Sequence, residues 1–294
     1  MRVEFAGREL APDLNATAVM LNGVGAGTVL DHVQVHRTTD DCFAWFGGTV
    51  DARFLVATAC GNDGFDWQLG YTGTTQFALG AQEIGTVISG GNGLEGDNNE
   101  NGWDLLPRSH PKLCNVTALG TRGQPGTPSA QPQDGGLAKL LVAGFARAGL
   151  DLQHPTPGCT AGPALTGELL VRDSLFFDNG PTGAEHCASG AGASTPSPCS
   201  GCEFYDLLAN DFGLVPTCAA RARSDASDQN PAVDPGVPLG WPPADPRPTN
   251  AAAVANGFDC ATLDPAFVTT GYLGAFDPNG ANWLAAPWVS LAAN

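Results

Sequence analysis

Basic residues are scarce in this sequence. Its 294 residues contain 13 Lys+Arg against 30 Asp+Glu, a formal net charge of −17. Phosphate recognition requires clustered cations, so this balance argues against nucleic acid and against an anionic membrane surface as partners. The excess of carboxylates instead favours bound divalent cations, or ligands that are neutral or cationic.

Long apolar runs and helical periodicity are also missing. No stretch of about 18 consecutive apolar residues is present, so no membrane span is predicted. Met1 to Phe5 reads as a strand and not as an export signal. The 39 Gly and 23 Pro residues predict many turns, while a hydrophobic content of 43% excludes a disordered chain. An all-β domain fits these features.

The nine cysteines are many for a reducing compartment. Because no convincing zinc partners accompany them, we expect structural disulfides that involve Cys187, Cys199, Cys202 and Cys218. Oxidised cysteines imply a secreted or cell-surface protein, yet the sequence shows no export signal. The simplest expectation is that the chain is the C-terminal part of a longer exported precursor whose first coils are missing.

A repeated motif organises the first half of the chain. The segment at 40–48 (DDCFAWFGG) is echoed at 62–70 (NDGFDWQLG), and Asp41, Phe43 and Trp45 correspond to Asp63, Phe65 and Trp67. A looser copy follows at 92–95. A repeat of about 20 residues, made of short strands between Gly/Asn/Asp turns, is typical of a β-solenoid in which each coil packs on the next.

The sequence therefore predicts an all-β, right-handed parallel β-helix with two parts. Residues 1–180 would form the coils. Residues 181–294 would form an irregular, Cys- and Pro-rich cap, rich in disulfides, that packs back on the solenoid, because the dense prolines at 235–248 remove ladder donors. Trp241, Trp283 and Trp288 are the expected anchors of this cap.

Several segments together resemble a known group of proteins. They are VEFAG, NGVGAGTVLDHVQV, DDCFAWFGGTV, GNDGFDWQLGYTG, GDNNENGWDLLPRS, FFDNG and the terminal GAFDPNGANW. As a set they are similar to exported bacterial proteins, of the kind found in myxobacteria and Bacteroidetes, that form right-handed parallel β-helices. The resemblance covers about residues 2–180 and the last twenty or so. It implies the fold and export, but no established activity.

Alternation along the repeated strands separates core from surface. Phe43, Trp45, Phe65 and Trp67 share one face, which we interpret as the core. The opposite face would stack Ala44, Asp66, Glu95 and Asp151 from coil to coil. Neighbouring carboxylates on this acidic column could share a cation or a proton. A solvated acidic stripe without any activity is the alternative.

A second acidic segment resembles part of a calcium loop. Asp97, Asn99, Asn101 and Gly102 match the opening D-x-[DN]-x-[DN]-G pattern, but Arg108 stands where the loop would need a glutamate. Asp104 could supply the missing carboxylate. The sequence thus predicts a Ca²⁺ site at Asp97, Asn99, Asn101 and Asp104, with a polar turn as the alternative.

Two functions remain open from the sequence. The first is a secreted or cell-surface module that binds a polysaccharide or another surface partner, with Tyr71, Trp103 and Phe46 as an exposed aromatic platform. The second is a polysaccharide-active enzyme, a lyase or a glycoside hydrolase, that uses Asp66, Glu95, Asp151 and Arg53. The acidic column itself contains no basic residue, which favours the binding module. Asp40, Asp41, Asn62 and Asp63, at the corners of the coils, are expected to hydrogen-bond the backbone of neighbouring turns.

Overall fold

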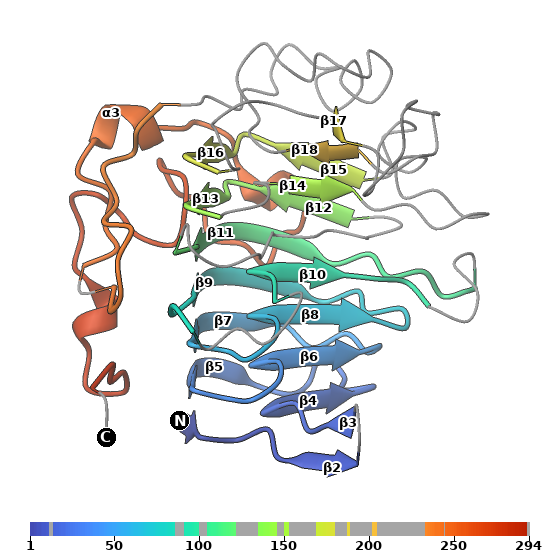
Figure 1. The fold of residues 1–294 in the computed structure, drawn as a ribbon. Helices are drawn as coiled ribbons and strands as arrows, with labels where there is room; N and C mark the ends of the chain where they lie inside the picture. The colour runs from blue at the N-terminus through green and yellow to red at the C-terminus, as the bar shows by residue number, and fades with distance from the viewer. Residues whose placement is uncertain are drawn as a thin grey trace.

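The computed structural model describes eleven segments of the chain. They are residues 1–11, 14–85, 91–99, 105–121, 135–145, 150–152, 169–179, 187–188, 202–204, 233–243 and 245–292. Within them almost all regular structure is β-strand (Figure 1).

The strands form two main parallel sheets. The nine-stranded sheet contains β1 (Arg2–Glu4), β5 (Leu30–His36), β7 (Ala52–Thr58), β9 (Thr74–Ala81), β11 (Lys112–Leu119), β12 (Gly135–Ala138), β13 (Leu141–Ala143), β15 (Leu169–Arg172) and β16 (Leu175–Phe177). The four-stranded sheet has the order β10 (Leu94–Gly96), β8 (Phe65–Gln68), β6 (Phe43–Phe46) and β4 (Val19–Asn22).

Smaller elements are also present in the described residues. An antiparallel sheet joins β14 (Leu150–Leu152), β18 (Cys202–Phe204) and β17 (Cys187–Ala188), and a second one pairs β2 (Glu9–Ala11) with β3 (Leu14–Asn15). The C-terminal part contains the short helix α3 (Ala251–Val254) and two 3-10 turns, η1 (Cys260–Thr262) and η2 (Trp283–Ala285).

The order of the strands along the chain confirms the parallel β-helix. From β4 to β11 the chain alternates between the four-stranded and the nine-stranded sheet, and each strand pairs in parallel with its counterpart in the next coil. The register aligns Phe43 with Phe65 and Trp45 with Trp67, as the repeat predicted. Parallel strands need such long crossovers, and here each crossover is the rest of a coil.

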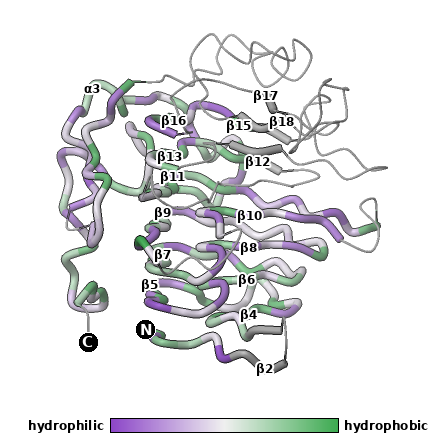
Figure 2. Tube along the Cα trace, viewed as in Figure 1, coloured by the Kyte–Doolittle hydropathy of each residue, from purple (hydrophilic) through white to green (hydrophobic). Residues whose placement is uncertain are grey.

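The interior of the coils is apolar and well packed. Phe43, Trp45, Phe65 and Trp67 are buried, and the Phe43 and Phe65 rings stack with their centroids 5.5 Å apart. Figure 2 shows both hydrophobic and hydrophilic stretches along the coils, and successive side chains of each strand point to opposite faces. The signature aromatics are therefore core residues, as expected.

Each coil of the nine-stranded sheet bends at one residue in the left-handed backbone region. None of these residues is glycine, yet each has φ between +47° and +59°. Such values are uncommon for residues other than glycine. The pairing skips them, so each marks a corner where a side chain points out of the ladder. They form one column along the stack: His32, Phe54, Phe77, Asn115, Lys139 and Asp173.

The C-terminal segment runs along this corner column. We call residues 233–243 and 245–292 the C-terminal strap. Figure 1 shows it, in orange to red, beside the stack from the level of β16 down to β5. At its upper end the Asn256 amide donates to the Asp173 carboxylate (3.0 Å), and at its lower end Gln34 exchanges two hydrogen bonds of 2.8 Å with the backbone of Ser290.

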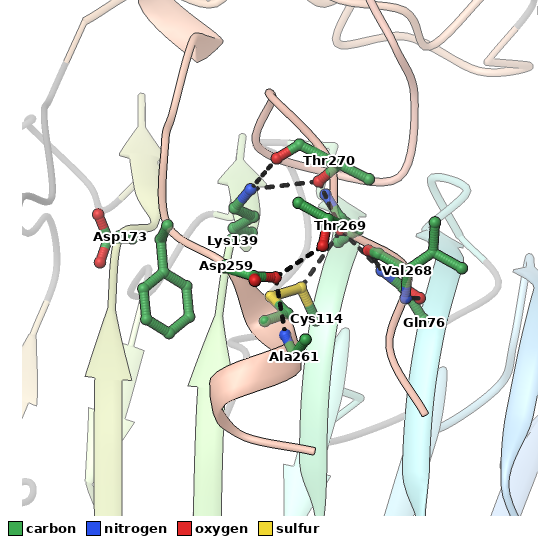
Figure 3. The surroundings of a disulfide bond; sticks show 12 residues. Gln76, Cys114, Lys139, Asp173, Asp259, Ala261, Val268, Thr269 and Thr270 are labelled. Carbon is green, nitrogen blue, oxygen red and sulfur yellow. Dashed lines mark hydrogen bonds between the residues drawn. A yellow bond between two sulfur atoms is a disulfide. The ribbon is translucent and has the colours of Figure 1, made fainter. Parts of the chain in front are cut away.

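The middle of the strap is held by buried polar side chains (Figure 3). Lys139 is buried and its ammonium group donates to the carbonyl oxygen of Thr270. Asn115 donates to the carbonyl oxygens of Tyr272 and Gly274 at 2.9 and 3.0 Å. The disulfide Cys114–Cys260 adds a covalent link between β11 and the strap.

The strap also covers an apolar stripe on the outside of the nine-stranded sheet. Val56, Leu79, Leu119 and Leu141 point away from the coil interior, and they pack against apolar side chains of the strap, including Phe276. The three predicted anchors, Trp241, Trp283 and Trp288, are among the partly buried residues packed there. Without the strap this stripe would be an exposed hydrophobic surface.

Alternation along Leu30–His36 predicts an outward, surface-facing set of His32, Gln34 and His36. Gln34 and His36 are nevertheless buried, because the strap covers them. The described disulfides are Cys42–Cys60 and Cys114–Cys260, which the sequence did not single out. Of the predicted set, Cys187 and Cys202 lie in strands whose side chains are not described, and Cys199 and Cys218 lie outside the described residues.

Candidate functional site

Aspartates at one corner of the coils form a ladder. The Asp41 carboxylate accepts a hydrogen bond from the backbone N–H of Asp63 (3.0 Å), and the Asp63 carboxylate accepts one from the backbone N–H of Asn92 (2.5 Å). The pairs are separated by 22 and 29 residues in sequence, which is one coil in each case. The expected role of Asp41 and Asp63 in binding the neighbouring turns is confirmed.

The outer face of the four-stranded sheet carries two rows of side chains next to this ladder. The register places Ala44 beside Asp66, and Asp66 beside Glu95, so the acidic column exists across these coils. The second row contains Asn22, Phe46 and Gln68 in adjacent strands. We call this surface the outer face of the four-stranded sheet, defined by Met20, Asn22, Ala44, Phe46, Asp66, Gln68 and Glu95.

The carboxylates near this face are unusually buried. Asp66 is only 5% exposed, and Asp63 and Asp97 are buried as well, whereas Glu95 is partly exposed. Burial removes water from a carboxylate and so favours its neutral form. The expectation of a solvated acidic stripe is therefore wrong for Asp66, because alternation predicts the face of a side chain but not what covers it.

Burial and mutual repulsion both change the protonation of the cluster. Burial raises the pKa of Asp41 to about 6. Burial, followed by the charge of Glu95 and a hydrogen bond with its side chain, raises the pKa of Asp63 well above the ordinary value. Burial and the charges of Asp41 and Glu95 raise the pKa of Asp66 in the same direction. The group can therefore hold protons near neutral pH, or bind a positive charge in their place.

The other predicted catalytic residues are not brought to this face. Arg53 is exposed on β7, which belongs to the nine-stranded sheet. Asp151 lies in β14, which pairs with β18 in the small antiparallel sheet and does not continue the column after Glu95. The structure thus joins Asp66 to Glu95 but separates both from Arg53 and Asp151, because coil lengths after β10 depart from the regular repeat.

The predicted calcium loop is only partly described. Asp97 is buried beside β10, and its backbone N–H donates to the carbonyl oxygen of Trp67 (2.8 Å). Asn99 is described and partly buried, whereas Asn101 and Asp104 lie outside the described residues. Within the segments that the structure describes, no group of three or more His, Cys, Asp and Glu side chains is arranged to hold a metal ion. A Ca²⁺ site here stays a prediction.

The aromatic platform is reduced to one described residue. Tyr71 is 1% exposed, its ring stacks on Trp45 and its hydroxyl donates to the carbonyl oxygen of Val50 (2.9 Å). The prediction of an exposed Tyr71 is wrong, because the residue belongs to the coil interior. Trp103 lies outside the described residues, and Phe46 is partly exposed on the outer face of the four-stranded sheet.

Sequence reasoning did not place Asp41 and Asp63 in the acidic cluster. It assigned them a structural role, which they have, but their carboxylates also act on Asp66 and Glu95. The sequence contained a sign of this proximity, because Asp63 and Asp66 are only three residues apart within the same repeated segment.

Comparison with known proteins agrees with the observed topology. Neither a curated protein nor a solved structure matches the chain. Among the described residues, no helix is long and apolar enough to cross a membrane. Residues 1–179, more than half of the chain, match the family described as the pectate-lyase like beta helix domain, and the chain therefore belongs to that family.

Proposed function

We propose that this protein is an extracellular module that binds polysaccharide on the outer face of the four-stranded sheet. The observation that carries the proposal is the register that sets Phe46 between Asn22 and Gln68, in the row next to Asp66 and Glu95. Sugar-binding surfaces combine an aromatic ring, which stacks on the apolar face of a sugar, with amide and carboxylate groups that hydrogen-bond its hydroxyls.

The regular spacing of this face suits a repeating ligand. Adjacent strands of a sheet lie about 4.8 Å apart, so equivalent side chains in successive coils recur at a fixed interval. The backbone that carries them is held in place by the Asp41 and Asp63 hydrogen bonds and by Cys42–Cys60. A rigid surface of this kind binds a polymer without having to become ordered first.

The family and the disulfides support an extracellular protein that contacts polysaccharide. A pectate-lyase-like domain is consistent with a protein that meets polysaccharides. Cys42–Cys60 and Cys114–Cys260 are consistent with an oxidising, extracellular environment.

A polysaccharide-active enzyme is the second candidate. It is favoured by the raised pKa of Asp66 beside the partly exposed Glu95, since a glycosidase needs one carboxylic acid and one carboxylate. Against it, neither Arg53 nor Asp151 lies on the same face, so the other residues expected to take part in catalysis are absent from it. Binding therefore has the stronger support.

The test is to titrate the oxidised protein against a panel of neutral, anionic and amine-bearing polysaccharides by isothermal calorimetry. Phe46→Ala should weaken binding about tenfold, because a stacked aromatic ring contributes about 1 to 1.5 kcal/mol. Phe5→Ala, which truncates an exposed phenylalanine next to β1, is the matched control and should leave binding unchanged. Equal affinity of the wild type and Phe46→Ala would contradict the proposed surface, and shortening of the polymer would favour the enzyme.

A further inference from the structure

The acidic cluster contains a buried oxygen atom without a partner. One oxygen of the Asp66 carboxylate, Oδ2, accepts a hydrogen bond from the Gln68 amide at 3.3 Å. The other, Oδ1, is buried and has no hydrogen-bond partner. A buried carboxylate oxygen that lacks a donor is energetically costly, so it marks a place where a donor from outside the chain would be stabilised.

The surroundings of this oxygen are negative. The strongest charges that act on Asp66 come from Asp41, Glu95 and Asp97, and all of them are carboxylates. Glu95 lies beside Asp66 in the next strand and is partly exposed, so it connects the buried cluster to the surface. A ligand group that enters past Glu95 would thus meet two carboxylates, those of Glu95 and Asp66.

The residues next to the cluster indicate what kind of cation fits. A metal ion needs several ligands around one point, and no such group is found among the described residues. A primary ammonium needs less, because its three N–H donors can serve two carboxylates and one further acceptor. Phe46 and Gln68 lie in the adjacent row and can bind the sugar ring that carries the amine.

We propose that the polysaccharide bound at this face carries primary amino groups, and that one ammonium group lies between Asp66 Oδ1 and the Glu95 carboxylate. This inference rests on the proposed function and specifies its ligand class, an amino sugar polymer with free amines. It also gives a role to the two carboxylates that lie in the row next to Phe46.

The test compares two ligands that differ only at the amine. Hexamers of β-1,4-linked glucosamine and of β-1,4-linked N-acetylglucosamine are titrated against the oxidised, full-length chain at one fixed pH near neutrality. We expect the amine-bearing hexamer to bind roughly tenfold or more tightly, as a charge-assisted hydrogen bond to a poorly solvated carboxylate implies. Acetylation removes the charge and two of the three N–H donors.

Isosteric variants assign the preference to the cluster. Glu95→Gln and Asp66→Asn should each reduce the preference for the amine to about twofold or less. Glu4→Gln, which changes the net charge equally but lies on β1 in the nine-stranded sheet, should keep it. Circular dichroism checks folding, and if Asp66→Asn does not fold, the partly exposed Glu95 decides the question through Glu95→Gln.

The other outcomes are separable. If both hexamers bind equally and Phe46→Ala weakens both, the amine proposal is wrong while the proposed function stands. If the preference survives both Glu95→Gln and Asp66→Asn, the amine is attracted by the overall charge of −17 and not by this site. If no polysaccharide of the panel binds at all, the proposed function fails and this inference fails with it.

Discussion

The carboxylate of Asp63 accepts a hydrogen bond from the backbone N–H of Asn92 in the next coil. Both residues are buried, so no water can replace this bond when it is broken. The same relation joins Asp41 to Asp63 one coil earlier, which makes the aspartates a continuous support for the edge of the four-stranded sheet.

Replacing Asp63 with alanine should destabilise the protein. The variant leaves the Asn92 N–H buried without an acceptor, which costs about 1 to 3 kcal/mol in the free energy of unfolding. Asp63→Asn keeps an acceptor oxygen and avoids burying a charge, so it should be closer to the wild type. Guanidinium unfolding followed by circular dichroism measures both. An alanine variant as stable as the asparagine variant would show that the bond contributes little.

The stability that Asp41 contributes should fall as the pH rises. Burial raises the pKa of Asp41 to about 6 in the folded protein, from an ordinary value of 3.8. Between these values the folded state binds more protons than the unfolded state, so the free energy of unfolding decreases with increasing pH. The contribution is complete below about pH 4 and lost above about pH 6. Asp41→Asn should remove this decrease in a series of unfolding measurements.

His36 provides the opposite control for that experiment. Its burial lowers its pKa to about 4, from 6.5, so the unfolded state binds more protons in this interval. The stability that His36 contributes is complete above about pH 6.5 and lost as the pH falls through about 4. His36→Gln should therefore make the protein relatively more stable at acidic pH. If Asp41→Asn and His36→Gln changed the pH dependence of the free energy of unfolding in the same direction, this assignment would be contradicted.

Removing the disulfide between β11 and the strap should cost more than removing the one within the coils. Cys114–Cys260 joins residues 146 apart, and Cys42–Cys60 joins residues 18 apart. In the chain-entropy model the longer loop contributes about 5 kcal/mol and the shorter about 3 kcal/mol. The double variants Cys114→Ser/Cys260→Ser and Cys42→Ser/Cys60→Ser can be compared by urea unfolding. Tryptophan fluorescence should report release of the strap mainly in the first, and the reverse order of stability would contradict the prediction.

The repeat of the coils could be predicted from the sequence because stacking demands it. Phe43 and Phe65 occupy the same position in successive coils, and the parallel register requires similar residue types there. Once coil lengths became uneven, this signal failed. The sequence predicts Asp151 as a member of the acidic column, but β14 pairs with β18, and no comparable pattern in the sequence indicates that pairing.

The strap could be expected only in outline. The prolines and tryptophans indicated a segment that packs back on the coils, but its path depends on Gln34, Asn115 and Lys139. These side chains bind backbone carbonyl groups of the strap. Because every residue has a backbone carbonyl, the sequence does not reveal which residue of the strap each side chain binds. The burial of Asp66 was missed for a similar reason, since periodicity assigns a side chain to a face without showing what lies above it.

The strap has a consequence for how the stack comes apart. Proteins built from stacked repeats can lose their end units one at a time, because each repeat touches only its neighbours. Here Gln34, near one end of the stack, is bound to Ser290, 256 residues later, and the same strap is bound to Asn115, Lys139 and Asp173 further along. No coil in this span can detach while the strap stays in place. The coils that the strap joins should therefore unfold together in one cooperative transition, as a compact globular domain does, and not one at a time.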